Sequence, residues 1–213
     1  MGTKAKSKKN VIVILVYVVF MVCVFLFIDP IADYIERPSI KHLPGLIKNL
    51  SSTDGKTYRE ATRRIGDYGE RATSAIPYLI NELKREDWVD SNVTGEALAK
   101  IGKPALPDLI LSLDSDDKNT RSGAAYAISQ MGPIAKDAVP LLMQRLKDEP
   151  DYQVKSRIIF GLGEIGYASF PAILMLKGIA DDPETGFYPD AKLAIDNIKR
   201  SYKDNKNYSQ RDR

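Results

Sequence analysis

Residues 161–166 read Gly-Leu-Gly-Glu-Ile-Gly and match the pattern Gly-x-Gly-x-x-Gly. In dinucleotide-binding proteins, glycines at this spacing let the backbone approach a pyrophosphate, and the motif needs a strand before it and a helix that begins after it. Here the motif lies at the end of a helix-like apolar pattern. Gly161 and Gly166 also correspond to Ala97 and Gly102 of an earlier segment with a similar pattern, where a small residue is followed five positions later by a glycine that ends a helix. We therefore interpret these glycines as structural and predict no nucleotide cofactor.

Histidine and cysteine occur once each, as His42 and Cys23. A zinc or iron site requires several such ligands, and His42 is followed by Leu43 rather than by a second metal-binding side chain. One histidine near the start of the predicted domain also gives little support to a Ser-His-Asp arrangement. Cys23 lies inside an apolar run and cannot form an intrachain disulfide. We predict no catalytic residue, no metal site and no cofactor, so we expect a protein that is not an enzyme.

Acidic residues cluster four times, and each cluster follows a segment with a helical apolar pattern. Aspartate is a preferred residue immediately before a helix, where it accepts hydrogen bonds from free backbone N–H groups. We interpret the clusters as solvated turns that cap the next helix. A divalent cation or a basic partner along the same edge remains the alternative for residues 86–87, 114–117, 148–151 and 181–184.

These clusters belong to a longer repeat in which a helix-like run, a glycine, a proline-led apolar run and an acidic turn follow one another. The prolines that mark the repeat lie 30, 33 and 31 residues apart, with a half-copy 33 residues earlier, at Pro44, Pro77, Pro107, Pro140 and Pro171. A period of about 30 residues is typical of a solenoid. No long stretch after residue 30 alternates between apolar and polar residues, so a strand-rich fold is disfavoured.

Each repeat predicts a pair of short helices. In residues 93–101 the apolar side chains Val93, Ala97, Leu98 and Ile101 fall on one helical face. A glycine then ends the first helix, and the proline begins the second. The glycines predicted to end first helices are Gly66, Gly102, Gly132 and Gly166, and small residues for close helix packing stand five positions earlier at Ala61, Ala97, Ala127 and Gly161.

The second helices bury the residues at +2, +3 and +6 from the proline: Leu79, Ile80 and Leu83; Leu109, Ile110 and Leu113; Leu142, Met143 and Leu146. The fourth repeat is irregular, because Lys177 stands at +6 from Pro171. Helix pairs of this size cannot bury their apolar faces alone, so they must stack. We predict an all-α fold, an α-solenoid.

The pattern of small residue, Ile or Met, Gly, Pro and acidic turn resembles HEAT-like repeats of the phycobilisome-lyase type, over residues 40–199. The resemblance implies a protein-binding scaffold whose second helices line the concave side. The positions opposite the buried stripe then become candidate protein-binding residues: Tyr78, Asn81, Glu82, Arg85, Asp108, Leu111, Ser112, Leu141, Gln144 and Arg145.

The ends of the chain differ from the repeats. Residues 11–28 carry no charge and are long enough to cross a bilayer as a helix. Four lysines precede them, so we predict an uncleaved transmembrane anchor with a cytoplasmic N-terminus. We expect a basic cytoplasmic lead (1–10), the anchor (11–28), a linker (29–39), the repeat domain (40–200) and a disordered polar tail (201–213). The repeat domain comprises a half-repeat cap, four repeats and a C-terminal cap helix.

Charge also separates the ends from the repeats. The net charge of +3 combines +4 from residues 1–10 and +4 from residues 199–213 with −5 from residues 11–198. A solenoid that binds nucleic acid is expected to show the opposite distribution, so we predict a protein partner, no nucleic acid and no small-molecule substrate.

We therefore expect a non-enzymatic scaffold tethered to a membrane, with its repeat domain outside the cytoplasm (in the periplasm, if the host is a Gram-negative bacterium). A structural spacer or self-assembly module is the alternative. A protein that works like a bilin lyase, handling a tetrapyrrole and its acceptor protein, is a minor third possibility that the resemblance implies.

Overall fold

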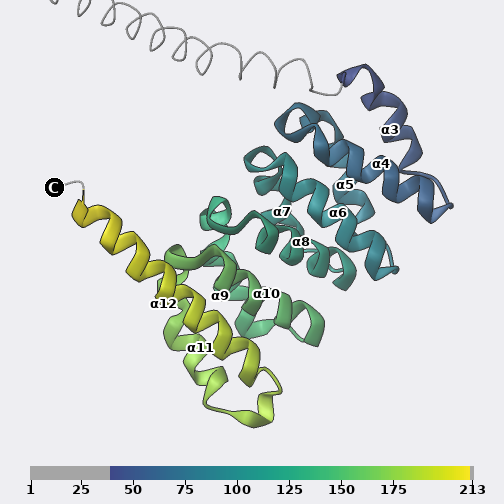
Figure 1. Ribbon diagram of the computed structural model, residues 1–213. Helices are drawn as coiled ribbons and strands as arrows, with labels where there is room; N and C mark the ends of the chain where they lie inside the picture. Colours follow the sequence, from purple (N-terminus) through teal and green to yellow (C-terminus); the bar gives the residue numbers. More distant parts are fainter. Residues whose placement is uncertain (1–38, 212–213) are drawn as a thin grey trace, which may run out of the picture. The chain divides into compact units, whose positions relative to one another are not determined.

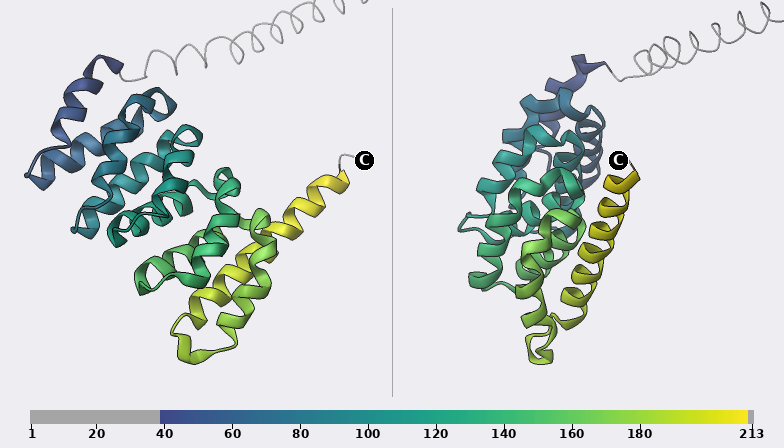
Figure 2. Two further views of the ribbon diagram at one scale, coloured as in Figure 1. Left: turned by 180° about the vertical axis from the view of Figure 1, so that it is seen from behind. Right: turned by 90° about the vertical axis from the view of Figure 1, so that its left-hand side faces the viewer.

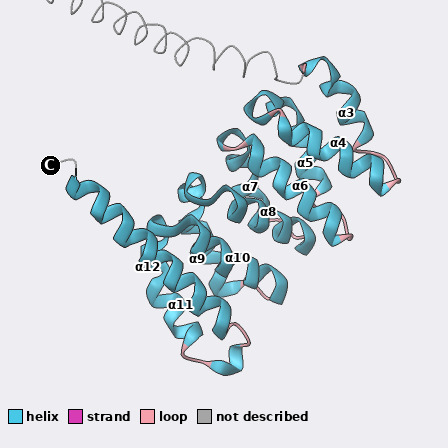
Figure 3. Ribbon diagram, in the orientation of Figure 1, coloured by secondary structure: helices cyan, strands magenta, loops and turns pink. Residues whose placement is uncertain are grey.

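The computed structural model describes residues 39–211, with side chains described to residue 206. Within this range every regular element is a helix and no strand occurs (Figure 3). The described residues from Ile40 onward belong to one compact unit. The predicted lead, anchor and linker to residue 38 lie outside the described residues. The prediction of an all-α solenoid is confirmed.

The helices form two sets that alternate along the chain (Figure 1). The first helices of the pairs are α4 (Gly55–Asp67), α6 (Trp88–Ile101), α8 (Lys118–Met131), α10 (Tyr152–Ile165) and α12 (Tyr188–Arg211). The shorter second helices are α3 (Leu43–Asn49), α5 (Ile76–Glu82), α7 (Leu106–Ser112), α9 (Val139–Asp148) and α11 (Ile173–Ala180). Each first helix packs on the next first helix, so the pairs stack in chain order (Figure 2).

Short 3-10 helices connect the two members of each pair, which the sequence patterns did not predict. They are η3 (Gly69–Ala75), η4 (Lys103–Ala105), η5 (Gly132–Ala138) and η6 (Gly166–Ala172), with η2 (Ile40–His42) and η7 (Pro183–Thr185) elsewhere in the stack. Three of the connections have seven residues, whereas η4 has three. The second repeat is therefore built with a shortened turn.

An aspartate stands directly before each of four first helices, and three of these aspartates belong to the acidic clusters. Asp54 accepts a hydrogen bond from the Thr57 backbone N–H at 3.0 Å, and Asp117 accepts one from that of Thr120 at 2.7 Å. Asp87 and Asp151 do the same for α6 and α10. The interpretation of the acidic clusters as helix caps is thus confirmed for Asp87, Asp117 and Asp151. In the fourth cluster Asp182 caps η7 instead, and the cap at Asp54 was not predicted.

Glycines end the first helices, with one difference from the prediction. Gly102, Gly132 and Gly166 have positive φ, as expected, but Gly66 lies inside α4 and the positive φ falls at Gly69. Gly66 serves close packing instead, because a Cβ there would lie 2.9 Å from Cα of Ala97. The sequence pattern predicted that the helix ends at Gly66, the first glycine of the repeat. Only the packing of α4 against α6 shows that Gly66 is needed for close contact between the helices.

Prolines begin α3, α5, α7 and α9, each as the second residue of its helix. The fourth repeat departs from the predicted register. Pro171 lies inside η6, and α11 begins at Ile173, so Leu174 takes the place that proline has in the other repeats. Counted from Leu174, the +2 position is Leu176, which is fully buried. The apparent irregularity at Lys177 came from aligning Pro171 three residues too early.

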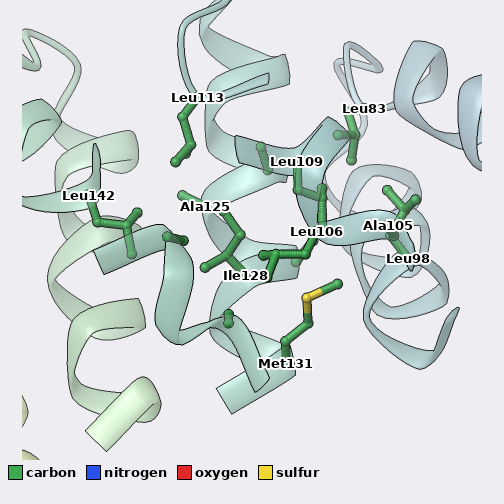
Figure 4. Packing of buried hydrophobic residues seen from close by; sticks show 14 of the residues in the cluster. Leu83, Leu98, Ala105, Leu106, Leu109, Leu113, Ala125, Ile128, Met131 and Leu142 are labelled. Atoms are coloured by element: carbon green, nitrogen blue, oxygen red, sulfur yellow. The ribbon is translucent and has the colours of Figure 1, made fainter. Parts of the chain in front are cut away.

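The core runs through the stack between the two sets of helices. Leu79, Leu109 and Leu142, at +2 of the second helices, are fully buried, and the +6 leucines are nearly so. The +3 residues Ile80, Ile110 and Met143 are only partly buried and pack against the core from its edge. Figure 4 shows Leu109 of α7, and Leu113 directly after this helix, among Ala125 and Ile128 of α8. A missed core position precedes each proline, at Ile76, Leu106 and Val139.

The C-terminal segment also differs from expectation, because α12 continues through the predicted tail to Arg211. Tyr202 of α12 lies against Phe170, with ring centroids 4.9 Å apart, and the Ser201 hydroxyl accepts a hydrogen bond from the Tyr167 N–H at 3.0 Å. These contacts with η6 order the helix beyond residue 200, although the segment has no apolar periodicity of its own.

Among the described residues, one stretch, Tyr152–Ala180, is apolar and long enough to cross a membrane by length and composition alone, with a mean hydropathy of 1.6. Half of it is buried inside the fold. It also comprises two helices, α10 and α11, joined through the positive-φ residue Gly166. We interpret it as part of the solenoid core.

Candidate functional site

The ten candidate binding residues do not share one environment. Tyr78 and Leu111 are exposed, with 54% and 71% of their surfaces accessible, and Asn81 and Gln144 are exposed as well. Asp108 is partly buried, and its backbone oxygen accepts a hydrogen bond from the Ser112 hydroxyl at 2.7 Å. Only Tyr78, Asn81, Leu111 and Gln144 of the ten candidates are therefore exposed to a partner.

Other candidates are engaged within the fold. Ser112 is buried at 7% exposure, so it offers no free surface. Leu141 is partly buried and packs against the core. Arg145 forms an ion pair with Asp114 of the preceding acidic turn. The face assignment is thus accurate for Leu111 but not for Ser112, because the short α7 turns its last residue inward.

Arg85 and Glu82 form part of a structural cluster. Arg85 contacts Glu82 at 2.7 Å and Asp90 at 3.2 Å, and its guanidinium lies over the ring of Tyr58, 3.7 Å from the centroid. It also donates hydrogen bonds to the backbone oxygens of Leu50 and Ser52. Although burial opposes it, the hydrogen bond to Glu82 raises the pKa of Arg85 above its ordinary value. Arg85 ties the N-terminal cap to the first full repeat.

A groove opens beside Leu111, along the exposed edge of α7. Its volume is about 740 Å³, and the side chains that line it are mainly apolar: Leu106, Pro107, Ile110, Leu111, Pro104, Lys103, Glu70 and Asp137. Volumes of this size are typical of binding pockets. We call this feature the α7 groove.

The short connection before α7 accounts for the groove. Pro77 and Pro140 follow the positive-φ glycines of their repeats by eight residues, whereas Pro107 follows Gly102 by five. The three missing residues leave η4 shorter than η3 and η5 on either side. We infer that the shorter η4 leaves one side of α7 uncovered. Glu70 of η3 and Asp137 of η5 flank this uncovered side.

The α7 groove combines an apolar floor with charges of both signs at its edge. Lys103 comes from η4, Glu70 from η3 and Asp137 from η5. Apolar anchors surrounded by polar groups are the usual anatomy of a protein-binding surface. Of the ten predicted residues only Leu111 lines this groove. The sequence feature that could have indicated the other lining residues is the shortened spacing between Gly102 and Pro107.

The acidic turns offer a poorer site. Glu149 is buried and accepts two hydrogen bonds from Arg121, at 2.9 and 2.8 Å, and Asp114 pairs with Arg145. Within residues 39–206, no group of three or more His, Cys, Asp or Glu side chains is placed to hold a metal ion. His42 is exposed and stands directly before α3.

The three glycines of residues 161–166 have packing roles. A Cβ on Gly163 would lie 2.9 Å from Cα of Ala194 in α12, and one on Gly161 would contact Ser129 of α8 at 3.6 Å. Gly166 ends α10 with a φ of +72°. The motif is therefore the surface on which α10 meets both neighbouring first helices.

Comparisons with known proteins agree with this architecture. A family model of HEAT repeats matches residues 76–163. A phycobilisome maturation protein of Synechococcus elongatus is 29% identical to this chain over 98 residues. The match spans 46% of this chain and 46% of that protein, so the chain is compared with less than half the length of its curated relative.

Two engineered proteins of known crystal structure are among the solved structures to which this chain is similar. One is 22% identical with a TM-score of 0.46, over 75% of this chain and 80% of the engineered chain. The other is 21% identical with a TM-score of 0.47, over 74% of this chain and 47% of the engineered chain. The resemblance to HEAT-like repeats, inferred from residue spacing, is confirmed over the residues that the family model matches.

Proposed function

We propose that this chain is a non-enzymatic scaffold whose HEAT-like repeats bind a protein partner through the α7 groove. The observation that carries the proposal is Leu111, a leucine with 71% of its surface exposed at the edge of an apolar groove of about 740 Å³. A concave site lined mainly by apolar side chains is the usual form of a binding site. An apolar side chain that a partner buries can account for about 2 kcal/mol or more of binding free energy.

Site-specific photocrosslinking in the native host tests this proposal. A photoreactive phenylalanine analogue replaces Leu111 in the full-length protein, and the control carries it at Leu174, which is 81% exposed on α11. We expect a discrete crosslinked protein from position 111 alone, and less of it when Lys103→Glu is added at an exposed position that lines the groove. Equal crosslinking from both positions would contradict the proposal.

The same experiment separates the scaffold from the spacer. If position 111 crosslinks only to a second copy of this chain, the groove serves self-assembly. The protein is then a structural spacer or self-assembly module rather than a scaffold for another protein. Crosslinked products are distinguished by mass, since a product of two copies has twice the 23.8 kDa mass of the chain.

A second candidate function follows from the relative named as a phycobilisome maturation protein. In this candidate, the α7 groove would hold a linear tetrapyrrole or a segment of the protein that accepts it. Mixing the full-length protein with phycocyanobilin tests the idea directly, because binding of a bilin shifts and intensifies its visible absorption. A spectrum identical to that of free bilin at a tenfold excess of protein would remove this candidate.

The proposed scaffold is held at a membrane by residues 11–28, with the repeats outside the cytoplasm. The support is the uncharged sequence of this segment and the four lysines before it. Alkaline phosphatase, which is active only outside the cytoplasm of bacteria, is fused after Arg213. We expect activity from this fusion and none when Lys4, Lys6, Lys8 and Lys9 are moved to follow residue 28. If a reporter that is active only in the cytoplasm is active at the same position, the proposed topology is wrong.

A further inference from the structure

Arg157 of α10 lies where three consecutive first helices meet. Its Nη1 donates a hydrogen bond to the backbone oxygen of Ser122 in α8 at 3.2 Å, and its Nη2 donates one to Oδ1 of Asn92 in α6 at 2.8 Å. The guanidinium also lies 4.9 Å from the ring centroid of Tyr126. Both hydrogen-bond partners are neutral, so the positive charge is held in place without being neutralised.

The other partly buried arginines of the described residues differ in this respect. Arg59 pairs with Asp90, Arg85 with Glu82 and Asp90, Arg121 with Glu149, and Arg145 with Asp114. No carboxylate within residues 39–206 forms an ion pair with Arg157. Burial lowers the pKa of Arg157 from its ordinary value, and only Tyr126 acts in the opposite direction. Partial burial of a charge without a counter-ion is unfavourable, and a carboxylate of a bound partner would offset that cost.

A small notch exposes this guanidinium to solvent. The notch has a volume of about 30 Å³ and is lined by Arg157, Trp88, Gln153, Asn119, Ser91, Ser122, Arg85 and Glu86. Glu86 is exposed and makes no ion pair with Arg157. The notch is open to solvent and too small to enclose a metabolite, so only the end of one side chain of a larger ligand would reach the guanidinium.

Trp88 provides the apolar part of the same surface. It is 67% exposed at the start of α6, and an aromatic ring beside a cation is the combination often found at the centre of protein interfaces. The N–H groups of Arg157 that make no internal hydrogen bond are suited to a carboxylate, which accepts two parallel hydrogen bonds from a guanidinium.

We propose that the notch around Arg157 binds the carboxylate of a glutamate or aspartate in a partner polypeptide, with Trp88 covering the neighbouring residues of that segment. This surface belongs to the first helices α6, α8 and α10, whereas the α7 groove belongs to a second helix and the adjoining turns. The two sites are independent, so failure of one proposal leaves the other intact.

The only tryptophan of the sequence is Trp88, so its intrinsic fluorescence reports on this notch alone. The full-length protein in mild detergent is titrated with a capped pentapeptide of glutamate, with the matching glutamine pentapeptide and with inorganic phosphate. We expect a saturable fluorescence change with the glutamate peptide, weakened by salt, and none with the glutamine peptide. No saturable change with the glutamate peptide up to 5 mM, or an equal response to phosphate, would overturn the proposal.

Variants then assign the response to Arg157. We expect Arg157→Gln to weaken binding of the glutamate peptide at least tenfold, and Arg157→Lys to retain part of it, because lysine keeps the charge but not the paired hydrogen bonds. Arg64→Gln, on the exposed part of α4, is the control for general surface charge and should bind as the native protein does. An equal loss in Arg64→Gln and Arg157→Gln would refute a specific site.

Thermal unfolding distinguishes a binding residue from a structural one. Replacing Arg157 by methionine removes its two hydrogen bonds and its contact with Tyr126 but leaves no buried carboxylate unpaired, so the melting temperature should fall only slightly. Arg121→Met, which leaves the buried Glu149 unpaired, should lower it more. If Arg157→Met lowers the melting temperature as much as Arg121→Met does, Arg157 is structural and the proposal fails.

Discussion

Arg121 and Glu149 form a paired, charge-assisted contact that joins two successive acidic turns of the stack. Nε and Nη2 of Arg121 donate to the two carboxylate oxygens of Glu149 at 2.9 and 2.8 Å, and Nη1 donates to the backbone oxygens of Ser115 and Asp116. The hydrogen bonds to Glu149 raise the pKa of Arg121. One arginine therefore holds the turn before α8 against the turn before α10.

Breaking this pair should be expensive, because the Glu149 side chain is only 1% exposed. Arg121→Met leaves a buried carboxylate unpaired, and we expect a loss of about 3–5 kcal/mol in the free energy of unfolding. Lys100→Met, which breaks the exposed pair with Asp67, should cost at most about 1 kcal/mol. Chemical denaturation at neutral pH measures both, and equal losses would show that burial of Glu149 has no energetic role.

The close approach of α4 and α6 can be tested at Gly66. Gly66→Ala places a Cβ 2.9 Å from Cα of Ala97, and we expect overpacking to cost about 1–3 kcal/mol. Gly178→Ala in α11 is the matched control, because nothing lies within 4 Å of its added Cβ. That change should stabilise the protein by about 0.4–1 kcal/mol. Stabilisation by both substitutions would mean that the first helices are farther apart than described.

Leu111 and Leu141 were both expected on the binding face, but the structure separates them. Leu111→Asp should leave the melting temperature within about 1 °C of the native value, because an exposed substitution changes little. Leu141→Asp inserts a charge beside the core and should lower the melting temperature by several degrees. Circular dichroism at 222 nm follows both transitions. A large loss for Leu111→Asp would place that residue in the core and remove the basis of the α7 groove.

The helix caps predict how stability depends on pH. The hydroxyl and backbone N–H of Thr57 lower the pKa of Asp54. Against the effect of burial, hydrogen bonds from Thr120 lower the pKa of Asp117 as well. Since the folded pKa values lie below the unfolded ones, this stabilisation is present above about pH 4 and is lost as the pH falls through the folded values.

Asp54→Asn with Asp117→Asn keeps neutral caps but removes this titration. We therefore expect the double variant to lose less stability than the native protein between pH 5 and pH 3 in urea unfolding. Asp196→Asn, an exposed position on α12, is the control and should follow the native curve. Parallel curves for the native protein and the double variant would show that the caps do not contribute to the acid response.

The positions of the repeats could be predicted because each depends on local chemistry. Aspartate before a helix and proline within its first turn act through the backbone next to them, and Asp87, Asp117, Pro107 and Pro140 all serve as their positions suggest. The same local reasoning was wrong for Pro171, whose spacing from Gly166 equals that of Pro107 from Gly102. Only the packing of Leu176 shows which register the fourth repeat adopts.

By itself the sequence determined the solenoid and most of the caps of its helices, since periodicity and capping are properties of neighbouring residues in the chain. The tertiary structure alone decided which surfaces are open. Leu111 is exposed while Ser112 is buried, and Arg157 lacks the carboxylate that Arg121 finds 28 residues away. The exposure of Leu111 depends on the shortened turn η4, and the missing counter-ion of Arg157 depends on how α6, α8 and α10 stack. Both are decided by residues that are close in space but distant in the sequence.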